Sequence, residues 1–158
     1  MAMPTIDQQL CFALYSASRA MTASYRPLLD GLGLTYPQYL VMLVMWEDER
    51  LTVGHLGARL HLDSGTLSPL LKRLESRGLV ARERSAEDER VVEVALTPEG
   101  RSLQELARDV PRQAFSATGL SLSDSADLLQ AVHQLTRSLE ESRHHSSPDE
   151  LSRRKDIP

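Results

Sequence analysis

The sequence predicts a mainly α-helical fold that includes a two-stranded β-ribbon. Three observations support this prediction. Apolar residues recur at three- and four-residue spacing through most of the chain, as on one face of a helix. Between Val80 and Leu96 the spacing changes to alternation, which is typical of strands. The chain has 158 residues, 41% of them hydrophobic and 25% charged, which suits one globular domain with its own core.

Two helices are predicted in the first third of the chain. Thr5 and Gln8 have the spacing of a capping box and are expected to begin the first helix, which ends in the stretch "DGLGL" that starts at Asp30. Thr35 and Gln38 repeat the capping-box spacing and predict the start of the second helix. Both helices therefore have local start signals that do not depend on the rest of the fold.

The middle of the chain predicts two short helices and a ribbon. The stretch "LTVGHLGARLHL" is expected to be a short helix capped by Thr52. The stretch "DSGTLSPLLKRLESRGL" predicts another helix, capped by Asp63 or Ser64 and closed by Gly78. "VARERS" and "VVEVAL" then predict a two-stranded ribbon around the charged turn "AEDER".

Two more helices are predicted after the ribbon. Thr97 caps the stretch "TPEGRSLQELARDV", and Pro98 suits the first helical position. "SLSDSADLLQAVHQLTRSLEES" predicts a last, long helix with an apolar stripe. The tail, residues 143–158, is polar and is expected to be flexible.

The order of these elements predicts a winged helix-turn-helix core at about residues 51–97. This core lies within a single expected domain, residues 1–142. The outer helices, at about 5–31 and 98–142, carry more apolar surface than such a core needs. We therefore expect them to be dimerisation helices that pair with a second copy, because two-fold DNA sites favour two-fold dimers.

The charge distribution permits a surface for nucleic acid. The formal net charge is −4. Residues 55–84, however, carry six Lys and Arg side chains against three Asp and Glu, so this segment is basic. A lone cysteine cannot form an internal disulfide, and the chain contains neither a signal-peptide pattern nor a membrane-spanning apolar run. The expectation is a soluble, cytoplasmic protein without a membrane partner.

The second short helix and the ribbon tip supply the candidate DNA-binding residues. In a helix-turn-helix the second helix enters the major groove with its N-terminal residues, and small hydroxyl side chains there permit close approach. Arg90 at the ribbon tip would suit a minor groove, and Asp88 can pair with it and fix its direction. Each piece alone is more typical of a solvated helix or turn. The candidates are Ser64, Thr66, Ser68, Pro69, Lys72, Arg73, Arg84, Asp88 and Arg90.

These stretches resemble a known family. "LTVGHLGARLHLDSGTLSPLLKRLESRGLVARERSAEDERVVEVALTPEG" resembles the winged helix core of the MarR repressors, including a D-x-R wing motif from Asp88 to Arg90. "CFALYSASR", "YRPLLDGLGLTYPQYLVMLVMWE" and "LDSGTLSPLLKRLE" are similar to its organic-hydroperoxide-responsive, OhrR-type branch. The resemblance is specific from about Leu10 to Gly100 and looser to about Glu141.

The resemblance gives Cys11 a role that its surroundings alone do not. From the residues, a lone cysteine on an apolar helix face is more typical of core packing. In the one-cysteine, OhrR-type branch a cysteine at this place is the peroxide sensor, and two tyrosines matching Tyr25 and Tyr36 hydrogen-bond its sulfur from the partner protomer. The resemblance thus implies a homodimeric repressor that releases a palindromic, double-stranded DNA operator when organic hydroperoxides oxidise Cys11. The oxidised sulfur would then be capped by a low-molecular-weight thiol.

Other functions remain open on the sequence alone. A MarR-type regulator controlled by a small phenolic ligand would leave Cys11 passive. A thiol peroxidase would need a resolving partner and acid–base groups that the sequence does not offer, so we do not expect an enzyme. A protein–protein adaptor is a further alternative. No cofactor is expected; the scattered histidines do not suggest a metal site, and Tyr15 and Tyr39 are expected to be packing groups.

Overall fold

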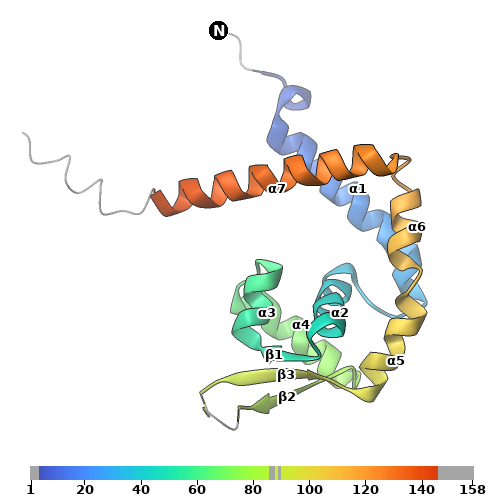
Figure 1. Ribbon diagram of the computed structural model, residues 1–158, viewed down its shortest axis with the longest axis vertical. Helices are drawn as coiled ribbons and strands as arrows, with labels where there is room; N and C mark the ends of the chain where they lie inside the picture. Colours follow the sequence, from blue (N-terminus) through green and yellow to red (C-terminus); the bar gives the residue numbers. More distant parts are fainter. Residues whose placement is uncertain (1–3, 86–87, 89, 146–158) are drawn as a thin grey trace, which may run out of the picture. The chain divides into compact units, whose positions relative to one another are not determined.

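The computed structural model describes residues 4–85, 88 and 90–145, and the predicted mainly α-helical fold with a small sheet is confirmed (Figure 1). The chain forms two compact units, Met1–Thr118 and Gly119–Pro158. The elements of the first unit are η1 (Ile6–Gln8), α1 (Leu10–Asp30), α2 (Tyr36–Asp48), β1 (Arg50–Thr52), α3 (Val53–Leu60), α4 (Ser64–Ser76), β2 (Val80–Arg84), β3 (Val92–Leu96), α5 (Pro98–Ala107) and α6 (Val110–Ser116). The second unit contributes α7 (Leu122–His145).

The first long helix begins later than the sequence predicts. The capping box at Thr5 is present, and the Thr5 N–H donates to Oε1 of Gln8 at 3.1 Å. It caps only the 3₁₀ turn η1, because Gln9 adopts an extended conformation (φ −86°, ψ 119°) and interrupts the helical backbone. Helix α1 therefore starts at Leu10, so that Cys11 lies in its first turn rather than well inside a longer helix.

The caps of the following helices are confirmed. Thr35 and Gln38 form the predicted capping box of α2. The side chain of Thr52 accepts a hydrogen bond from the His55 N–H at the start of α3, and Asp63 caps α4. These signals succeed because a cap depends on residues within one turn of helix.

Helices α1 and α4 end in the same way. The Leu34 N–H donates to the Leu29 carbonyl (3.2 Å) and the Gly33 N–H donates to the Asp30 carbonyl (3.0 Å), which together form a Schellman motif. Gly33 takes the positive φ (62°) that this motif requires. At the end of α4, Gly78 has the same role with φ 70°, as the sequence predicts.

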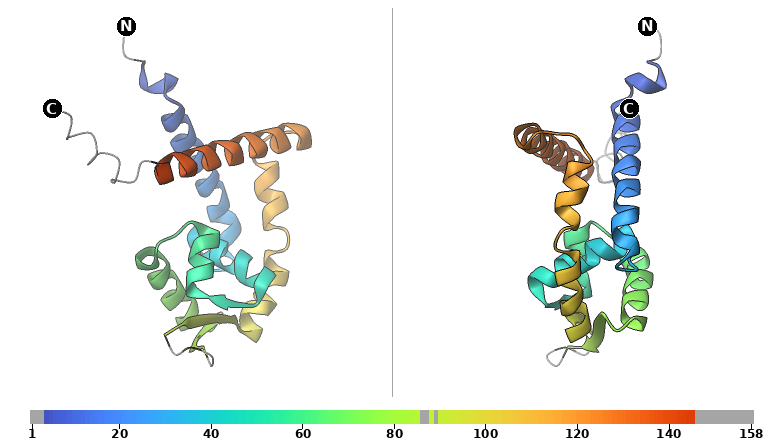
Figure 2. Two further views of the ribbon diagram at one scale, coloured as in Figure 1. Left: turned by 60° about the vertical axis from the view of Figure 1, so that its left-hand side comes forward. Right: turned by 90° about the vertical axis from the view of Figure 1, so that its right-hand side faces the viewer.

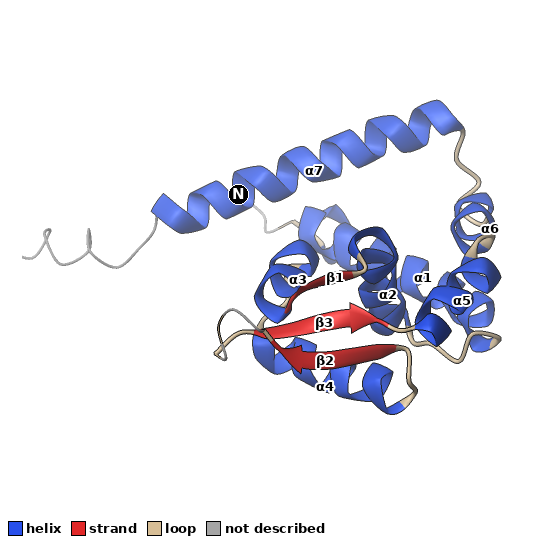
Figure 3. Cartoon of the chain, turned by 60° about the horizontal axis from the view of Figure 1, so that its bottom comes forward, coloured by secondary structure: helices blue, strands red, loops and turns tan. Residues whose placement is uncertain are grey.

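The predicted two-stranded wing is part of a three-stranded sheet. The order of the sheet is β1-β3-β2, and both pairings are antiparallel, with Leu51 opposite Val94 and Arg82 opposite Val94 (Figure 3). The ribbon of β2 and β3 is the predicted wing. The sequence does not indicate the third strand, β1, because it is three residues long, too short for an alternating pattern to be visible.

The core of the first unit is built around α2 and the helix-turn-helix. Helix α6 lies alongside α1, and α2 contacts α1, α3, α4 and α5 (Figures 1 and 2). Gly100 in α5 packs so closely that an added Cβ would lie 2.1 Å from the Leu79 carbonyl oxygen. The largest fully buried side chains are Tyr39, Leu29, Met42, Met45, Leu56, Leu67, Leu71 and Leu74.

The region after the wing contains one helix boundary that the sequence does not indicate. Thr97 caps α5 as predicted, and its side chain accepts the Gly100 N–H. The predicted helix "TPEGRSLQELARDV" ends at Ala107, and a separate helix, α6, begins at Val110, with Pro111 in its first turn. Proline suits a first turn because it lacks an N–H to donate there.

The second unit is a single long helix in the part that the structure describes. Helix α7 covers the predicted stretch and extends to His145. Its exposed apolar side chains are Leu122, Leu128, Leu129, Val132 and Leu139. Within residues 4–85, 88 and 90–145, none of the helices combines the length and apolar content that crossing a membrane requires.

Candidate nucleic-acid interface and thiol site

Helix α4 presents a polar face and a buried face. Ser64, Ser68 and Lys72 recur at intervals of four residues, so they share one side of the helix, and all three are exposed. Pro69 and Arg73 are exposed beside them. An adjacent side of the helix packs into the core through Leu67, Leu71 and Leu74. This arrangement leaves the predicted DNA-binding side of the helix available to a groove.

Thr66, another predicted DNA-binding residue, is already engaged by the cap of α4. Its N–H and its hydroxyl both donate to the Asp63 carboxylate, at 2.8 and 2.9 Å. These hydrogen bonds, the backbone one first, hold the pKa of Asp63 below its usual value. The Thr66 hydroxyl has therefore used its one proton and keeps only acceptor capacity toward a ligand.

The wing tip is shaped by a backbone contact of Asp88. Its Oδ1 accepts the Arg90 N–H at 2.9 Å, and its carbonyl accepts the Val91 N–H at 2.9 Å. The predicted contact between Asp88 and Arg90 thus orders the turn through the backbone. Arg84 and Arg90 are both exposed, and residues 86, 87 and 89 of the predicted charged turn lie outside the described residues.

An open groove brings part of α4 together with the wing. It has a volume of about 510 Å³ and is lined by Ser64 and Ser68 of α4, by Arg82 and Arg90 of the wing region, and by Thr52 at the start of α3, with apolar side chains between them. Ser64 and Ser68, two of the residues predicted to read bases, therefore line one groove with the predicted wing arginine, although more than twenty positions separate Ser68 from Arg90 in the sequence.

Structural contacts engage three of the six Lys and Arg side chains in residues 55–84. Arg59 pairs with Glu47 and Asp48, and Arg82 pairs with Glu75 at 2.6 Å. Arg77 donates to backbone carbonyls. Among the described residues of α4 and the wing, the Lys and Arg side chains without an ion-pair partner are Lys72, Arg73, Arg84 and Arg90. All four are among the predicted DNA-binding residues.

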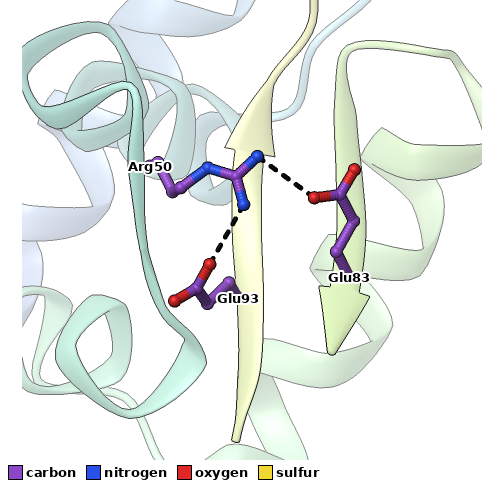
Figure 4. Close-up of polar contacts among 3 residues, drawn as sticks. All are labelled: Arg50, Glu83 and Glu93. Atoms are coloured by element: carbon purple, nitrogen blue, oxygen red, sulfur yellow. Dashed lines mark hydrogen bonds and ion pairs between the residues drawn. The ribbon is translucent and has the colours of Figure 1, made fainter. Parts of the chain in front are cut away.

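A cluster of three charges lies across the sheet, near the tip end of the wing. Glu83 and Glu93 stand directly opposite each other on β2 and β3, which would be unfavourable for two like charges. Arg50 of β1 bridges them, with 3.1 Å to Glu83 and 3.0 Å to Glu93 (Figure 4). No local spacing in the sequence indicates this cluster, because its members come from three strands.

Cys11 is exposed and is a free thiol. Its surroundings on α1 are also exposed, including Leu10 (62%) and Tyr15 (55%). Burial in the core of its own chain, which the residues alone favour, is therefore contradicted. The Cys11 side chain therefore lies among exposed apolar side chains on the surface of α1.

The structure brings Tyr25 and Tyr36 together but keeps them away from Cys11 of the same chain. The two ring centroids are 4.8 Å apart, and Tyr39 lies 5.8 Å from Tyr25. Cys11 and Tyr25 are fourteen residues apart on α1, which corresponds to about 21 Å along the helix axis. Contact between this thiol and these hydroxyls therefore requires a second chain.

Burial keeps the tyrosine hydroxyls protonated. It raises the pKa of Tyr36 above the ordinary value, and burial together with the neighbouring Tyr36 raises the pKa of Tyr25. For Tyr39 burial and the two other tyrosines raise the pKa to about 12. Over the neutral range the tyrosine pair can therefore donate hydrogen bonds. Tyr39 is fully buried, as expected of a packing group, whereas Tyr15 is exposed.

Comparisons with known proteins agree with this fold. Residues 23–106 match the family described as transcriptional regulator SarA/Rot. The organic hydroperoxide resistance transcriptional regulator of Bacillus subtilis is 49% identical over 134 residues, which cover 85% of this chain and 91% of the relative. The crystal structure of AbfR of Staphylococcus epidermidis is 35% identical, with a TM-score of 0.70, and the match covers 86% of this chain and 94% of AbfR.

A second AbfR structure, of the reduced protein bound to DNA, has a TM-score of 0.71 at 35% identity and covers 85% of this chain and 94% of that one. The family match at residues 23–106 includes the helix-turn-helix and the wing. The chain therefore belongs to the MarR family of winged helix-turn-helix transcriptional regulators, in the branch of the organic hydroperoxide resistance regulators.

Proposed function

We propose that the chain is a homodimeric repressor that binds a palindromic operator while Cys11 is reduced and releases it when an organic hydroperoxide oxidises Cys11. The observation that carries the proposal is the exposed thiol on α1 together with a tyrosine pair that the same chain cannot bring to it. In a symmetric dimer each chain would supply the thiol of one site and the tyrosines of the other.

The exposed apolar residues on the long helices support dimerisation. On α1 these are Leu10, Tyr15 and Met21, and on α7 they include Leu128 and Leu129. Such side chains are expected at an interface rather than in water. We assign the exposed apolar faces of the helices within about 5–31 and 98–142 to the dimer interface, and the winged helix core, about 51–97, to DNA.

The polar face of α4 and the wing support DNA binding. Ser64, Ser68 and Lys72 would enter the major groove, with Arg73 and Arg84 on flanking phosphates and Arg90 toward the minor groove. Thr66 would contact DNA as an acceptor only, and Asp88 would act by ordering the tip. The DNA complex of the related reduced AbfR supports DNA binding by this fold.

The chemistry at Cys11 is a two-electron oxidation. The thiolate attacks the peroxide oxygen of ROOH, the O–O bond breaks, and the products are the sulfenic acid and the alcohol ROH. A low-molecular-weight thiol then forms a mixed disulfide with the sulfur and releases water. Tyr25 and Tyr36 of the partner would donate hydrogen bonds to the thiolate, which favours the reactive form. A reducing cytoplasm would keep the resting sensor reduced.

The deciding experiment measures operator binding before and after cumene hydroperoxide treatment, with the intact mass recorded on the same samples. We expect release of DNA in step with a mass increase on Cys11. A Cys11→Ser protein should bind the operator and remain bound after treatment. Undiminished binding of the oxidised wild type, or release of the serine variant, would contradict the proposal. Release by phenolic acids with indifference to peroxide would favour the ligand-controlled regulator.

A further inference from the structure

Arg77 joins two helix ends that are far apart in the sequence. It follows the last residue of α4, immediately before Gly78. Its Nη1 donates to the Gly33 carbonyl at 2.5 Å and its Nη2 donates to the Leu32 carbonyl at 3.0 Å. Leu32 and Gly33 belong to the turn that closes α1 and leads into α2. One guanidinium group thus connects α4, the helix proposed to read DNA, to the α1–α2 turn.

The electrostatics of the two helix ends favour this contact. The carbonyl groups at a helix C-terminus carry partial negative charge. The Arg77 guanidinium lies beside the turn that closes α1, while the Arg77 backbone caps α4. The two planar N–H donors of arginine match two successive carbonyls, a geometry that an ammonium group cannot reproduce. A Cβ added at Gly33 would lie 3.0 Å from Nη2 of Arg77, so the turn also offers the guanidinium close access.

The turn held by Arg77 lies between the two tyrosines of the pair. Tyr25 is in the last turns of α1, and Tyr36 is the first residue of α2. Leu32 and Leu34, on either side of Gly33, are buried in the core and leave the turn little freedom. Any displacement of Tyr25 relative to Tyr36 therefore moves the ends of the α1–α2 turn, to which Arg77 is hydrogen-bonded.

We propose that Arg77 is a positioning residue that couples the tyrosine pair to the DNA-reading helix. The inference rests on the proposed function, in which oxidation of Cys11 displaces the tyrosines. A shift of the α1–α2 turn is passed through the guanidinium to the C-terminal end of α4, and the helix changes its orientation toward DNA. Without Arg77, the thiol is oxidised as before, but the orientation of α4 toward DNA changes less.

The test compares Arg77→Ala and Arg77→Lys with wild type and with Arg101→Ala as a matched control. Arg101 also makes a long-range contact, an ion pair with Glu49, but this contact joins α5 to the end of α2 and includes neither the α1–α2 turn nor α4. For each protein the dissociation constant for operator DNA is measured in the reduced and in the fully oxidised form. The extent of Cys11 oxidation is read by intact mass, and thermal unfolding checks the fold.

We expect the ratio of the oxidised to the reduced dissociation constant to fall about fivefold or more in Arg77→Ala, a typical size for coupling between sites. Arg77→Lys, which can still reach one carbonyl, should recover part of the ratio. The rate of Cys11 oxidation and the ratio of Arg101→Ala should match wild type. A purely structural role would weaken both forms equally and leave the ratio unchanged.

Two results would overturn the inference, and they are distinguishable. If wild type is released by hydroperoxide and Arg77→Ala is released with the same ratio, the coupling role is wrong and the proposed function stands. If oxidised wild type itself stays on the operator, the proposed function fails, and the coupling fails with it. If Arg77→Ala does not fold, Arg77→Lys decides: a ratio equal to that of wild type contradicts the requirement for the two-carbonyl contact.

Discussion

The rings of Tyr25 and Tyr36 lie 4.8 Å apart at an interplanar angle of 52°, one at the end of α1 and the other at the start of α2. Both side chains are half-buried, and burial raises the pKa of each hydroxyl. They therefore form a pair of protonated donors held by two helices. In the proposed dimer this pair is what distinguishes the thiol of Cys11 from an ordinary surface thiol.

Replacing either tyrosine of the pair should slow the oxidation of Cys11. A hydrogen bond to a charged group contributes roughly 2 kcal/mol, so Tyr25→Phe or Tyr36→Phe is expected to lower the rate by about thirtyfold. The rate is measured as loss of free thiol by intact mass at fixed hydroperoxide concentration. Tyr39→Phe, which removes a neighbouring hydroxyl assigned to packing, is the control, and an equal slowing in that variant would contradict a direct role of the pair.

Alkaline pH should destabilise the fold through Tyr39. Its pKa is raised to about 12 from the ordinary 10.0, mainly because the side chain is buried. The folded state thus holds the phenolic proton more tightly than the unfolded state, so the contribution to stability is complete below about pH 10 and is lost as the pH rises toward about 12. Urea unfolding across this range measures the loss. Tyr39→Phe should show a shallower decline, and an identical decline would contradict the assignment.

The salt dependence of operator binding should report on Lys72. One phosphate contact contributes about 0.9 to the slope of log affinity against log salt concentration. Lys72→Ala is therefore expected to reduce the slope by about one, measured by fluorescence anisotropy with a labelled operator. Arg108→Ala removes an exposed arginine that pairs only locally with Glu105 and should leave the slope unchanged. A slope for Lys72→Ala equal to that of wild type would mean that α4 presents a different side to DNA.

Gly100 should not tolerate a side chain. A Cβ there would lie 2.1 Å from the Leu79 carbonyl oxygen and 2.8 Å from Leu96, so the backbone of α5 or of the wing has to move. Gly100→Ala is expected to cost roughly 3 kcal/mol of unfolding free energy. Its carbonyl also accepts the Trp46 Nε1–H at 2.8 Å, so the indole fluorescence should change as well. Denaturant unfolding checks the loss, with Gly54→Ala, which meets only Thr52 at 3.9 Å, as the control.

Removing the bridging arginine of the sheet should loosen the wing. In Arg50→Gln the carboxylates of Glu83 and Glu93 remain opposite each other without a cation. We expect a lower melting temperature at low ionic strength and a smaller difference from wild type at high salt, because these charges are exposed and are screened. Arg50→Gln combined with Glu83→Gln should restore much of the loss. A melting temperature equal to that of wild type at every salt concentration would show that the cluster adds no stability.

Sequence could predict the elements whose causes are local. The caps at Thr35, Thr52 and Thr97 and the glycine closing α4 depend on residues within one turn, and all are confirmed. The extended Gln9 and the three-residue strand β1 have no pattern long enough to be recognised. The exposure of Cys11 also does not follow from the sequence. Periodicity places a residue on an apolar face of a helix but does not determine whether the same chain covers that face.

The contacts of Arg50 and Arg77 illustrate a different limit. Arg77 lies 44 residues from Gly33, and Arg50 lies 43 residues from Glu93, so neither partner follows from local spacing. The position of Arg77 at a helix end does indicate a cation near partial negative charge. The identity of the second helix end depends on tertiary packing. The candidate DNA-binding residues were easier to propose because they lie within two neighbouring elements.

The length of α1 has a consequence for how the protein would behave in a cell. About 21 Å of helix separates Cys11 from Tyr25. In one chain alone, the Cys11 sulfur would therefore receive no hydrogen bond from Tyr25 or Tyr36. Peroxide sensitivity would then follow mass action: it would increase with protein concentration and be lost on dilution below the dissociation constant of the dimer. A newly made, unpaired chain would be protected from premature oxidation, and responsiveness would begin only with assembly.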